Sequence, residues 1–344
     1  MRWRHATMTA AAVVCTGAAA VGVHGAVRPK SRTQANCASS ASTSVAYDVA
    51  VIGGGVVGLA VAREMAVRGR TVVLLEREDA PAAGASSGNS GIGCTGYDAP
   101  AGSLERRLLR RAIQLHPALL RSFGMSYEHV RKCGSLVVAW TAEELAELPR
   151  IVAQNREAGD LEVVQLSAAE LHELEPSLSA EALGAVFCPR EAVVEPWLVP
   201  AGYAHSAKIN GAELRMSREV TAVDYCATKQ LWHLRIRHTT FASSGRSAPG
   251  TLLVPRPEPK SRVTVPQGDE TVTARAVVNC AGLFGDTVEQ MRVRSSSTGS
   301  SDGGFTVTPR KGQFIVFSPP STLHGDSGAS PADARLVGCG GCCR

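Results

Sequence analysis

Three glycines and one glutamate stand at the spacing of a dinucleotide-binding motif. Gly53, Gly55 and Gly58 follow the apolar run VAVI and occupy the glycine positions of G-x-G-x-x-G. The first glycine allows a tight turn, the second lets the backbone approach a pyrophosphate, and the third lets a helix pack closely on the strand. Glu76 lies 21 residues after Gly55, the spacing of a carboxylate that binds the hydroxyls of an adenosine ribose. We predict a dinucleotide site here; the alternative is an ordinary βαβ unit that binds no nucleotide.

The elements that must hold these residues lie on both sides of the glycines. Residues 49–52 are apolar without polar interruption, which is typical of a strand buried on both faces of a parallel sheet. A helix is predicted from about residue 57 to residue 68, ended by Gly69, and the N–H groups and dipole at its start would face the phosphates. The run TVVLLE, residues 71–76, then predicts a second buried strand with Glu76 at its end.

The segment after Glu76 favours FAD over NAD. An NAD-binding domain would continue into another crossover helix and strand, whereas here a loop of small residues follows, from residue 83 to 91. Its backbone N–H groups and hydroxyls suit a long pyrophosphate and ribityl chain. Ser103 then stands as the N-cap of a predicted helix that runs through Leu109 and Ile113.

Four segments carry a resemblance to a known family. They are NSGI…GYDAPAGSLE at residues 89–105, LSAAELHELEPSLS, AVVEPWLVPAGYAHSA and ARAVVNCAGLFGD. With the glycine motif, they resemble the FAD-dependent oxidoreductases of the D-amino-acid oxidase and glycerol-3-phosphate dehydrogenase superfamily. The similarity is strongest to the glycerol-3-phosphate dehydrogenase-like and L-2-hydroxyglutarate dehydrogenase-like branches and covers roughly residues 46–317.

The resemblance implies which residues serve the cofactor and the substrate. Those expected to contact FAD are Gly53, Gly55, Gly58, Glu76, Ser87, Asn89, Ser90, Val220, Ala281 and Gly282. In FTVTPRKGQFIVF, which resembles a strand facing the flavin, Arg310 and Lys311 would pair with a substrate phosphate or carboxylate. The alternative for these two cations is a solvated turn. Cys94 stands where some relatives have a histidine, which argues against a covalent flavin link, and no metal site is expected.

The fold class predicted is mixed α/β: a Rossmann-like FAD-binding domain with a parallel sheet and an antiparallel β-meander, plus a partial substrate domain. Two helices have capping-box starts, at Thr141 with Glu144 and at Ser167 with Glu170. The predicted boundaries are a disordered targeting presequence at 1–45, FAD-binding segments at 46–125 and 186–290 with a surface loop at 242–262, substrate-domain helices at 126–185, a substrate-domain strand at 291–318 and a disordered tail at 319–344.

The net positive charge of the chain comes entirely from its N-terminal segment. Residues 1–47 hold five basic residues and no acid, so the remaining chain has 31 basic and 31 acidic residues. This balance argues against a nucleic-acid binder. The acid-free segment indicates a mitochondrial presequence, with a secretory signal or membrane anchor through apolar residues 6–27 as the alternative. The ten cysteines lack metal-ligand spacing and are expected as free thiols.

The predicted function is that of an FAD-dependent dehydrogenase. It would take a hydride from a small anionic secondary alcohol, like glycerol 3-phosphate, and pass electrons to a quinone or oxygen. The alternatives are an L-2-hydroxyglutarate-type dehydrogenase, an amine or amino-acid oxidase, and an inactive nucleotide-binding protein. Relatives of this fold continue for on the order of a hundred residues that complete the substrate domain. We therefore expect this sequence to be either a truncated reading of a longer protein or a genuine short form that binds FAD poorly and is not an active dehydrogenase.

Overall fold

The computed structural model describes residues 13–16, 46–125, 130–242, 261–264, 270–295 and 304–310. By their contacts the residues divide into two compact units. Unit 1 comprises Met1–Gly91, Ala118–Ser126 and Glu195–Thr308; unit 2 comprises Ile92–Pro117, Tyr127–Val194 and Pro309–Arg344. The domain boundaries predicted from the sequence remain a prediction.

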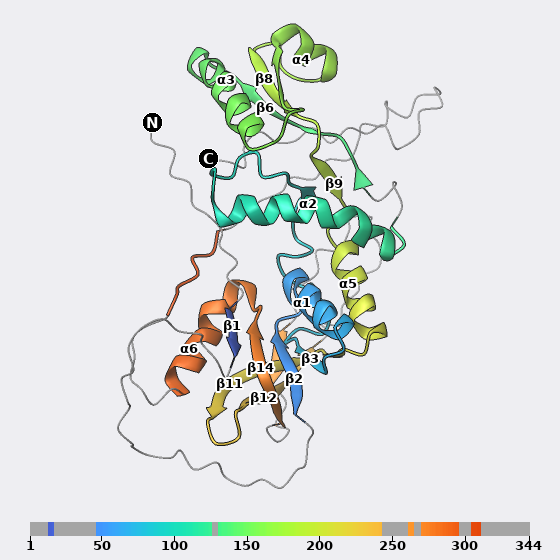
Figure 1. Ribbon diagram of the computed structural model, residues 1–344, viewed down its shortest axis with the longest axis vertical. Coiled ribbons are helices and arrows are strands. Elements are labelled where there is room, and N and C mark those ends of the chain that lie inside the picture. The colour runs from blue at the N-terminus through green and yellow to red at the C-terminus, as the bar shows by residue number, and fades with distance from the viewer. Residues whose placement is uncertain are drawn as a thin grey trace. The chain divides into compact units, whose positions relative to one another are not determined.

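The sheet of unit 1 combines parallel and antiparallel strands. Its main path runs in the order β10-β3-β2-β14-β12-β11, of which the first four strands are parallel (Figure 1). β12 pairs with both β14 and β11 antiparallel, and β1 and β13 add to β14 and β12 respectively. The strands are β1 (Val13–Thr16), β2 (Tyr47–Ile52), β3 (Val72–Leu75), β10 (Glu213–Arg215), β11 (Arg218–Cys226), β12 (Leu231–Ala242), β13 (Ser261–Thr264) and β14 (Glu270–Asn279). The mixed α/β class with its parallel sheet and meander is confirmed.

Helices cover this sheet, and successive residues of its central strands face opposite layers. Val49 and Val51 of β2 pack with α1 (Val56–Val67) and α5 (Leu198–Ile209), whereas Ala50 and Ile52 belong to a second cluster with β11, β12 and α6 (Gly285–Ser295). In Figure 1 the ribbons of α1 and α6 are accordingly drawn to opposite sides of the sheet. β3 is buried along its whole length. The prediction that both strands beside the glycine motif are buried on two faces is therefore confirmed.

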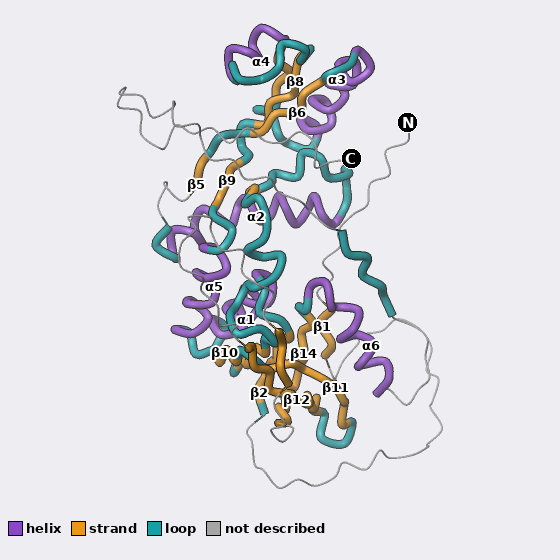
Figure 2. Tube along the Cα trace, turned by 180° about the vertical axis from the view of Figure 1, so that it is seen from behind, coloured by secondary structure: helices purple, strands orange, loops and turns teal. Residues whose placement is uncertain are grey.

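Unit 2 contains two small antiparallel sheets. One has the order β6-β8-β7 and carries α3 and α4; the other has the order β4-β9-β5. Figure 2 shows these strands and helices as orange and purple segments. The elements are β4 (Ile92–Gly93), β5 (Val130–Arg131), β6 (Ser135–Ala139), α3 (Ala142–Glu157), β7 (Val164–Ser167), α4 (Ala168–Leu174), β8 (Gly184–Cys188) and β9 (Ala192–Val194). The helix α2 (Leu104–Ser122) contributes residues to both units.

The side-chain caps predicted at three helix starts are present, one of them as half of a capping box. Ser103 accepts a hydrogen bond from the Arg106 amide at the start of α2, and Ser167 with Glu170 forms a full capping box at α4. At α3 the Thr141 hydroxyl accepts the Glu144 amide, but the Glu144 carboxylate accepts from the amide of Trp140. The capping box predicted there is thus only half formed, because its carboxylate bonds one residue too early.

Three segments have a secondary structure that the sequence did not indicate. Residues 213–226 divide into two strands: β10 pairs parallel to β3, and β11, which begins after Ser217 with its φ of +55°, forms an antiparallel hairpin with β12. The presequence predicted as disordered contains β1. The described part of the predicted 291–318 strand is helix α6 up to Ser295 and irregular at 304–310. The surface loop predicted at 242–262 and the tail at 319–344 lie largely or wholly outside the described residues.

Candidate functional site

The glycine turn is closed by backbone atoms that leave no room for side chains. Gly53 has φ +106° and donates its amide to the Leu75 carbonyl at 2.9 Å. A Cβ atom on Gly53 would lie 2.4 Å from the carbonyl oxygen of Cys280, and one on Gly58 would lie 2.0 Å from that of Gly53. Two of the three predicted glycines are therefore required by geometry alone, before any ligand is considered.

Gly55 stands at the N-cap of α1 and is needed for a different reason. Its φ is −71°, and a Cβ atom there would meet only the hydroxyl oxygen of Ser86, at 3.2 Å. A side chain is thus not excluded by the fold itself. Because Gly55 has no side chain, a pyrophosphate can come close to the main chain at the start of α1. This is the role predicted for this glycine.

Glu76 lies at the end of β3 and points back to the glycine turn. Its carboxylate accepts hydrogen bonds from the Gly54 amide and, at 2.8 Å, from the Glu78 amide. Its main chain is held as well, by bonds to Arg215 and Arg218. Gly54, which the sequence reasoning did not single out, matters because a Cβ atom there would lie 3.0 Å from the Glu76 side chain. The middle glycine of the GGG run was the available signal.

The loop after Glu76 folds mainly on itself. The Ser87 hydroxyl donates to the Ala82 carbonyl at 2.6 Å, and the Asn89 amide group bonds to the carbonyls of Ala85 and Ser86. Ser90 is exposed. The loop docks on the glycine turn through the Ala82 amide, which donates to the Gly54 carbonyl at 2.9 Å.

Ser86, which was not among the predicted site residues, provides the hydroxyl at the start of α1. Its oxygen accepts the amide of Val56 at 2.9 Å, whereas the N-cap residue Gly55 has no side chain to do so. The serine-rich composition of the loop indicated such a hydroxyl without saying which serine supplies it. The helix start and the loop are thus joined at the point where a phosphate group is expected.

The turn after β14 is the last part of the candidate site. We call this site the cradle; it consists of residues 53–58, Glu76 and residues 280–282. The Cys280 amide donates to the Ile52 carbonyl at 2.8 Å, which ties this turn to the end of β2. Gly282 has φ +55°, and the buried Asn279 side chain bonds to the Gly285 carbonyl and the Ala281 amide. Ala281 is beside Gly53, because a Cβ atom on Gly53 would lie 3.1 Å from its Cα.

The other predicted residues are placed differently. The Val220 side chain is in the core of unit 1, and its main chain pairs with Ile236 of β12 just before a β-bulge between Val220 and Ala222. Arg310 is exposed and is counted with unit 2, and Lys311 lies outside the described residues. The assignment of all predicted site residues remains a prediction.

Taken together, these residues fit the adenosine diphosphate part of FAD. The glycines remove every side chain from the turn, the start of α1 offers backbone donors and the positive end of its dipole, and Glu76 offers a carboxylate at the strand end. An acid at this position also disfavours a nucleotide with a phosphorylated ribose.

Replacing Ser86 tests the bond between the loop and α1. Ser86→Ala removes the acceptor of the Val56 amide, so we expect the free energy of unfolding of the apoprotein to fall by about 1 kcal/mol. The exposed Ser90, in the same loop, gives the matched control Ser90→Ala, which should leave stability unchanged. Urea unfolding measures both. Equal urea midpoints for the two variants would show that the Ser86 hydroxyl does not stabilise the start of α1.

Burial controls the reactivity of the thiol beside the glycine turn. It raises the pKa of Cys280 to about 11, so that at pH 8 only about one thiol in a thousand is ionised. We expect iodoacetamide to alkylate the exposed Cys133 first, and Cys280 only as the pH rises towards its pKa. Mass spectrometry of peptides measures the two rates, with urea-unfolded protein as the control. Equal alkylation rates of Cys133 and Cys280 at pH 8 in the folded protein would contradict the burial of the Cys280 thiol.

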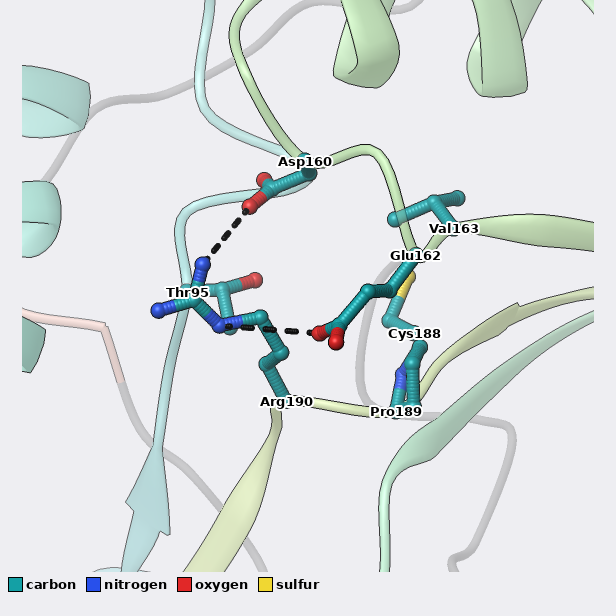
Figure 3. Close-up of a pocket in the computed structure, with 7 residues that line it drawn as sticks. All are labelled: Thr95, Asp160, Glu162, Val163, Cys188, Pro189 and Arg190. Atoms are coloured by element: carbon teal, nitrogen blue, oxygen red, sulfur yellow. Dashed lines mark ion pairs between the residues drawn. The ribbon is translucent and has the colours of Figure 1, made fainter.

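Unit 2 contains a small cavity that is not a cofactor site. Its volume is about 10 Å³, enough for one water molecule at most. Arg190 lies between Asp160 and Glu162 there, forming an ion pair of 3.9 Å with each (Figure 3). Within the described ranges, no cluster of His, Cys, Asp and Glu is arranged to hold a metal ion, and no helix has the length and apolar character of a membrane span.

Comparison with known proteins identifies relatives of most of the chain. Residues 48–340 match the DAO family model, described as FAD dependent oxidoreductase. Glycerol 3-phosphate dehydrogenase of Caloramator mitchellensis is 27% identical over 270 residues, which cover 78% of this chain and 47% of that protein. The mitochondrial L-2-hydroxyglutarate dehydrogenase of Nematostella vectensis is 27% identical over 277 residues, covering 79% and 54%. The chain therefore spans about half the length of these relatives.

A solved structure shows the same fold. Glycine oxidase from Geobacillus kaustophilus superposes with a TM-score of 0.51 at 28% sequence identity, covering 55% of this chain and 51% of that one. The resemblance found in the sequence is confirmed by both kinds of comparison.

Proposed function

This chain belongs to the DAO family of FAD-dependent oxidoreductases. We propose that it acts as a dehydrogenase that oxidises a small anionic secondary alcohol. Electrons would pass on to a quinone or to oxygen. The observation that carries the proposal is the cradle of unit 1, where Gly53 and Gly58 lie against the turn at Cys280 and Glu76 accepts the Gly54 amide. This arrangement suits the family's cofactor, FAD.

FAD, when bound, supplies the hydride acceptor of the reaction. The residues of this chain would hold it: Glu76 accepts hydrogen bonds from the ribose hydroxyls, and the start of α1 binds the pyrophosphate through backbone N–H groups. Each Glu76 oxygen already accepts one backbone amide, and its second lone pair would accept a ribose hydroxyl. Ala281 and Gly282 leave the turn after β14 free of bulky side chains.

The substrate proposed first is glycerol 3-phosphate. It is the substrate named for the Caloramator mitchellensis relative, which is 27% identical. Arg310, an exposed cation, and Lys311 after it would pair with the phosphate group. The second candidate is L-2-hydroxyglutarate, supported by the Nematostella vectensis relative at the same identity. Both are anionic secondary alcohols.

Dye reduction by the purified, FAD-loaded chain tests the proposal. Glycerol 3-phosphate should reduce the dye, and L-2-hydroxyglutarate should do so if the second candidate is right. Hydrogen peroxide formed from amino acids would instead indicate an amino-acid oxidase, while silence with all substrates despite bound FAD would indicate an inactive nucleotide-binding protein. Arg310→Ala should raise KM for the anionic substrate; an unchanged KM and kcat would remove Arg310 from the site.

We also propose a mitochondrial location. The support is the acid-free, arginine-containing composition of residues 1–47 and the mitochondrial designation of the Nematostella vectensis relative. Residues 1–45 fused to a fluorescent protein should direct it to mitochondria. Fluorescence in the secretory pathway would favour the alternative of a signal or anchor.

A further inference from the structure

A surface hollow in unit 2 is lined by arginines. Its volume is about 360 Å³, and four of its seven lining residues are Arg106, Arg107, Arg110 and Arg111 on α2. The remaining three, Gly102, Gln114 and Ala158, are uncharged. The volume lies in the range of small-ligand sites, about 300–1,000 Å³.

The positive charge of this hollow is largely uncompensated. Of the four arginines, only Arg110 forms an ion pair with a described residue, through Asp160 at 2.5 Å. That carboxylate also faces Arg190 at 3.9 Å, so its charge is divided between two cations. Arg111 bonds to the uncharged Gln114 at 3.2 Å. The hollow therefore holds a net positive field from several guanidinium groups.

The innermost arginine is buried and forms no ion pair with a described residue. Arg106 is 6% exposed, and its two terminal nitrogens donate to neutral acceptors, the Ala99 carbonyl at 2.9 Å and the Asn155 side-chain oxygen at 2.7 Å. Its Nε–H has no acceptor among the described residues. Burial and the neighbouring Arg110 lower the pKa of Arg106, because both disfavour its positive charge, and the carboxylates of Asp160 and Asp98 offset this only in part. A buried cation whose partners are all neutral is costly unless a counter-charge lies near.

We propose that this hollow binds a phosphate-bearing anion. Arg107 and Arg111, one turn apart on the exposed side of α2, would contact the phosphate oxygens, while Arg106 and Arg110 supply the fixed field behind them. Planar guanidinium groups match phosphate oxygens in pairs. The anion can come from a free diphosphate or from a phospholipid headgroup. The exposed Leu104 and Leu108 on the same helix would reach apolar chains in the second case.

Titration of the full 344-residue chain with inorganic pyrophosphate, and separately with phosphatidylcholine vesicles with and without phosphatidylglycerol, tests the proposal. The double variant Arg107→Gln/Arg111→Gln removes the exposed contacts. The control Arg121→Gln/Arg150→Gln removes two exposed charges that do not line the hollow. Far-UV circular dichroism checks that both fold, and the single variants replace the double one if it does not.

We expect the hollow variant to bind about tenfold or more weakly than the wild type, with the control unchanged. Binding should also weaken as salt is added. A loss confined to the pyrophosphate arm identifies a soluble ligand, and a loss confined to vesicles with phosphatidylglycerol identifies a lipid headgroup. The proposal is overturned if nothing binds in either arm, or if the hollow variant and the control bind alike.

Discussion

Gly58→Ala is expected to destabilise unit 1 by about 3 kcal/mol or more and to strip the protein of its FAD. The added methyl group would lie 2.0 Å from the Gly53 carbonyl oxygen and 3.3 Å from the Cys280 side chain. Neither α1 nor the end of β2 can move without disturbing the other, since backbone lies on both sides of the contact. Overpacking of this kind typically costs about 1–3 kcal/mol and more where the neighbour is rigid.

Urea unfolding and the flavin absorbance of the purified protein measure this effect. Gly84 provides the matched control, because it lies in the neighbouring loop and a Cβ atom there meets nothing within 4 Å. Gly84→Ala should keep both the midpoint and the cofactor. A Gly58→Ala protein with wild-type stability and FAD content would show that the helix is not held against the strand as described.

Glu76→Gln is expected to weaken FAD binding about tenfold to a hundredfold. The change keeps the size of the side chain but leaves one acceptor oxygen where the carboxylate has two. Those two oxygens bond to the amides of Gly54 and Glu78, and ribose hydroxyls would add to them. Hydrogen bonds to a charged group contribute about 1.5–3 kcal/mol each, which sets the expected range.

Fluorescence titration of the apoprotein with FAD measures this affinity. Glu78→Gln is the control, because it removes the same charge two residues further along and leaves the Glu76 carboxylate in place. If both variants bind FAD as the wild type does, the role of Glu76 is limited to holding the glycine turn.

The local parts of the cradle were predictable from the sequence, because short-range rules determine them. The glycine spacing, the flanking apolar strands and the acid at position 76 all lie within 30 residues of one another. Steric exclusion at Gly53 and Gly58 leaves few other residues possible there. A helix cap such as Ser103 is equally local, since its bond spans three residues.

The remaining features depend on contacts distant in sequence. Nothing near Ser86 distinguishes it from Ser87; only the docking of the loop on Gly54 brings its hydroxyl to Val56, 30 residues away. The pairing of β10 depends on its neighbour β3, some 140 residues earlier, and its own sequence does not reveal it. The Val220 side chain lies in the core beside its cross-strand partner Ile236, a placement that depends on the pairing of β11 with β12.

The position of β14 in the sheet has a consequence for biosynthesis. This strand separates β2 from β12, so the N-terminal β2 of unit 1 gains its second neighbour only when residues 274–279 have been made. Until then a ribosome-bound chain presents an unpaired edge of β2, the kind of surface that chaperones cover and that aggregates form on. The glycine turn also lacks its Cys280 wall during this time. We therefore expect FAD to bind only after residue 280 has left the exit tunnel.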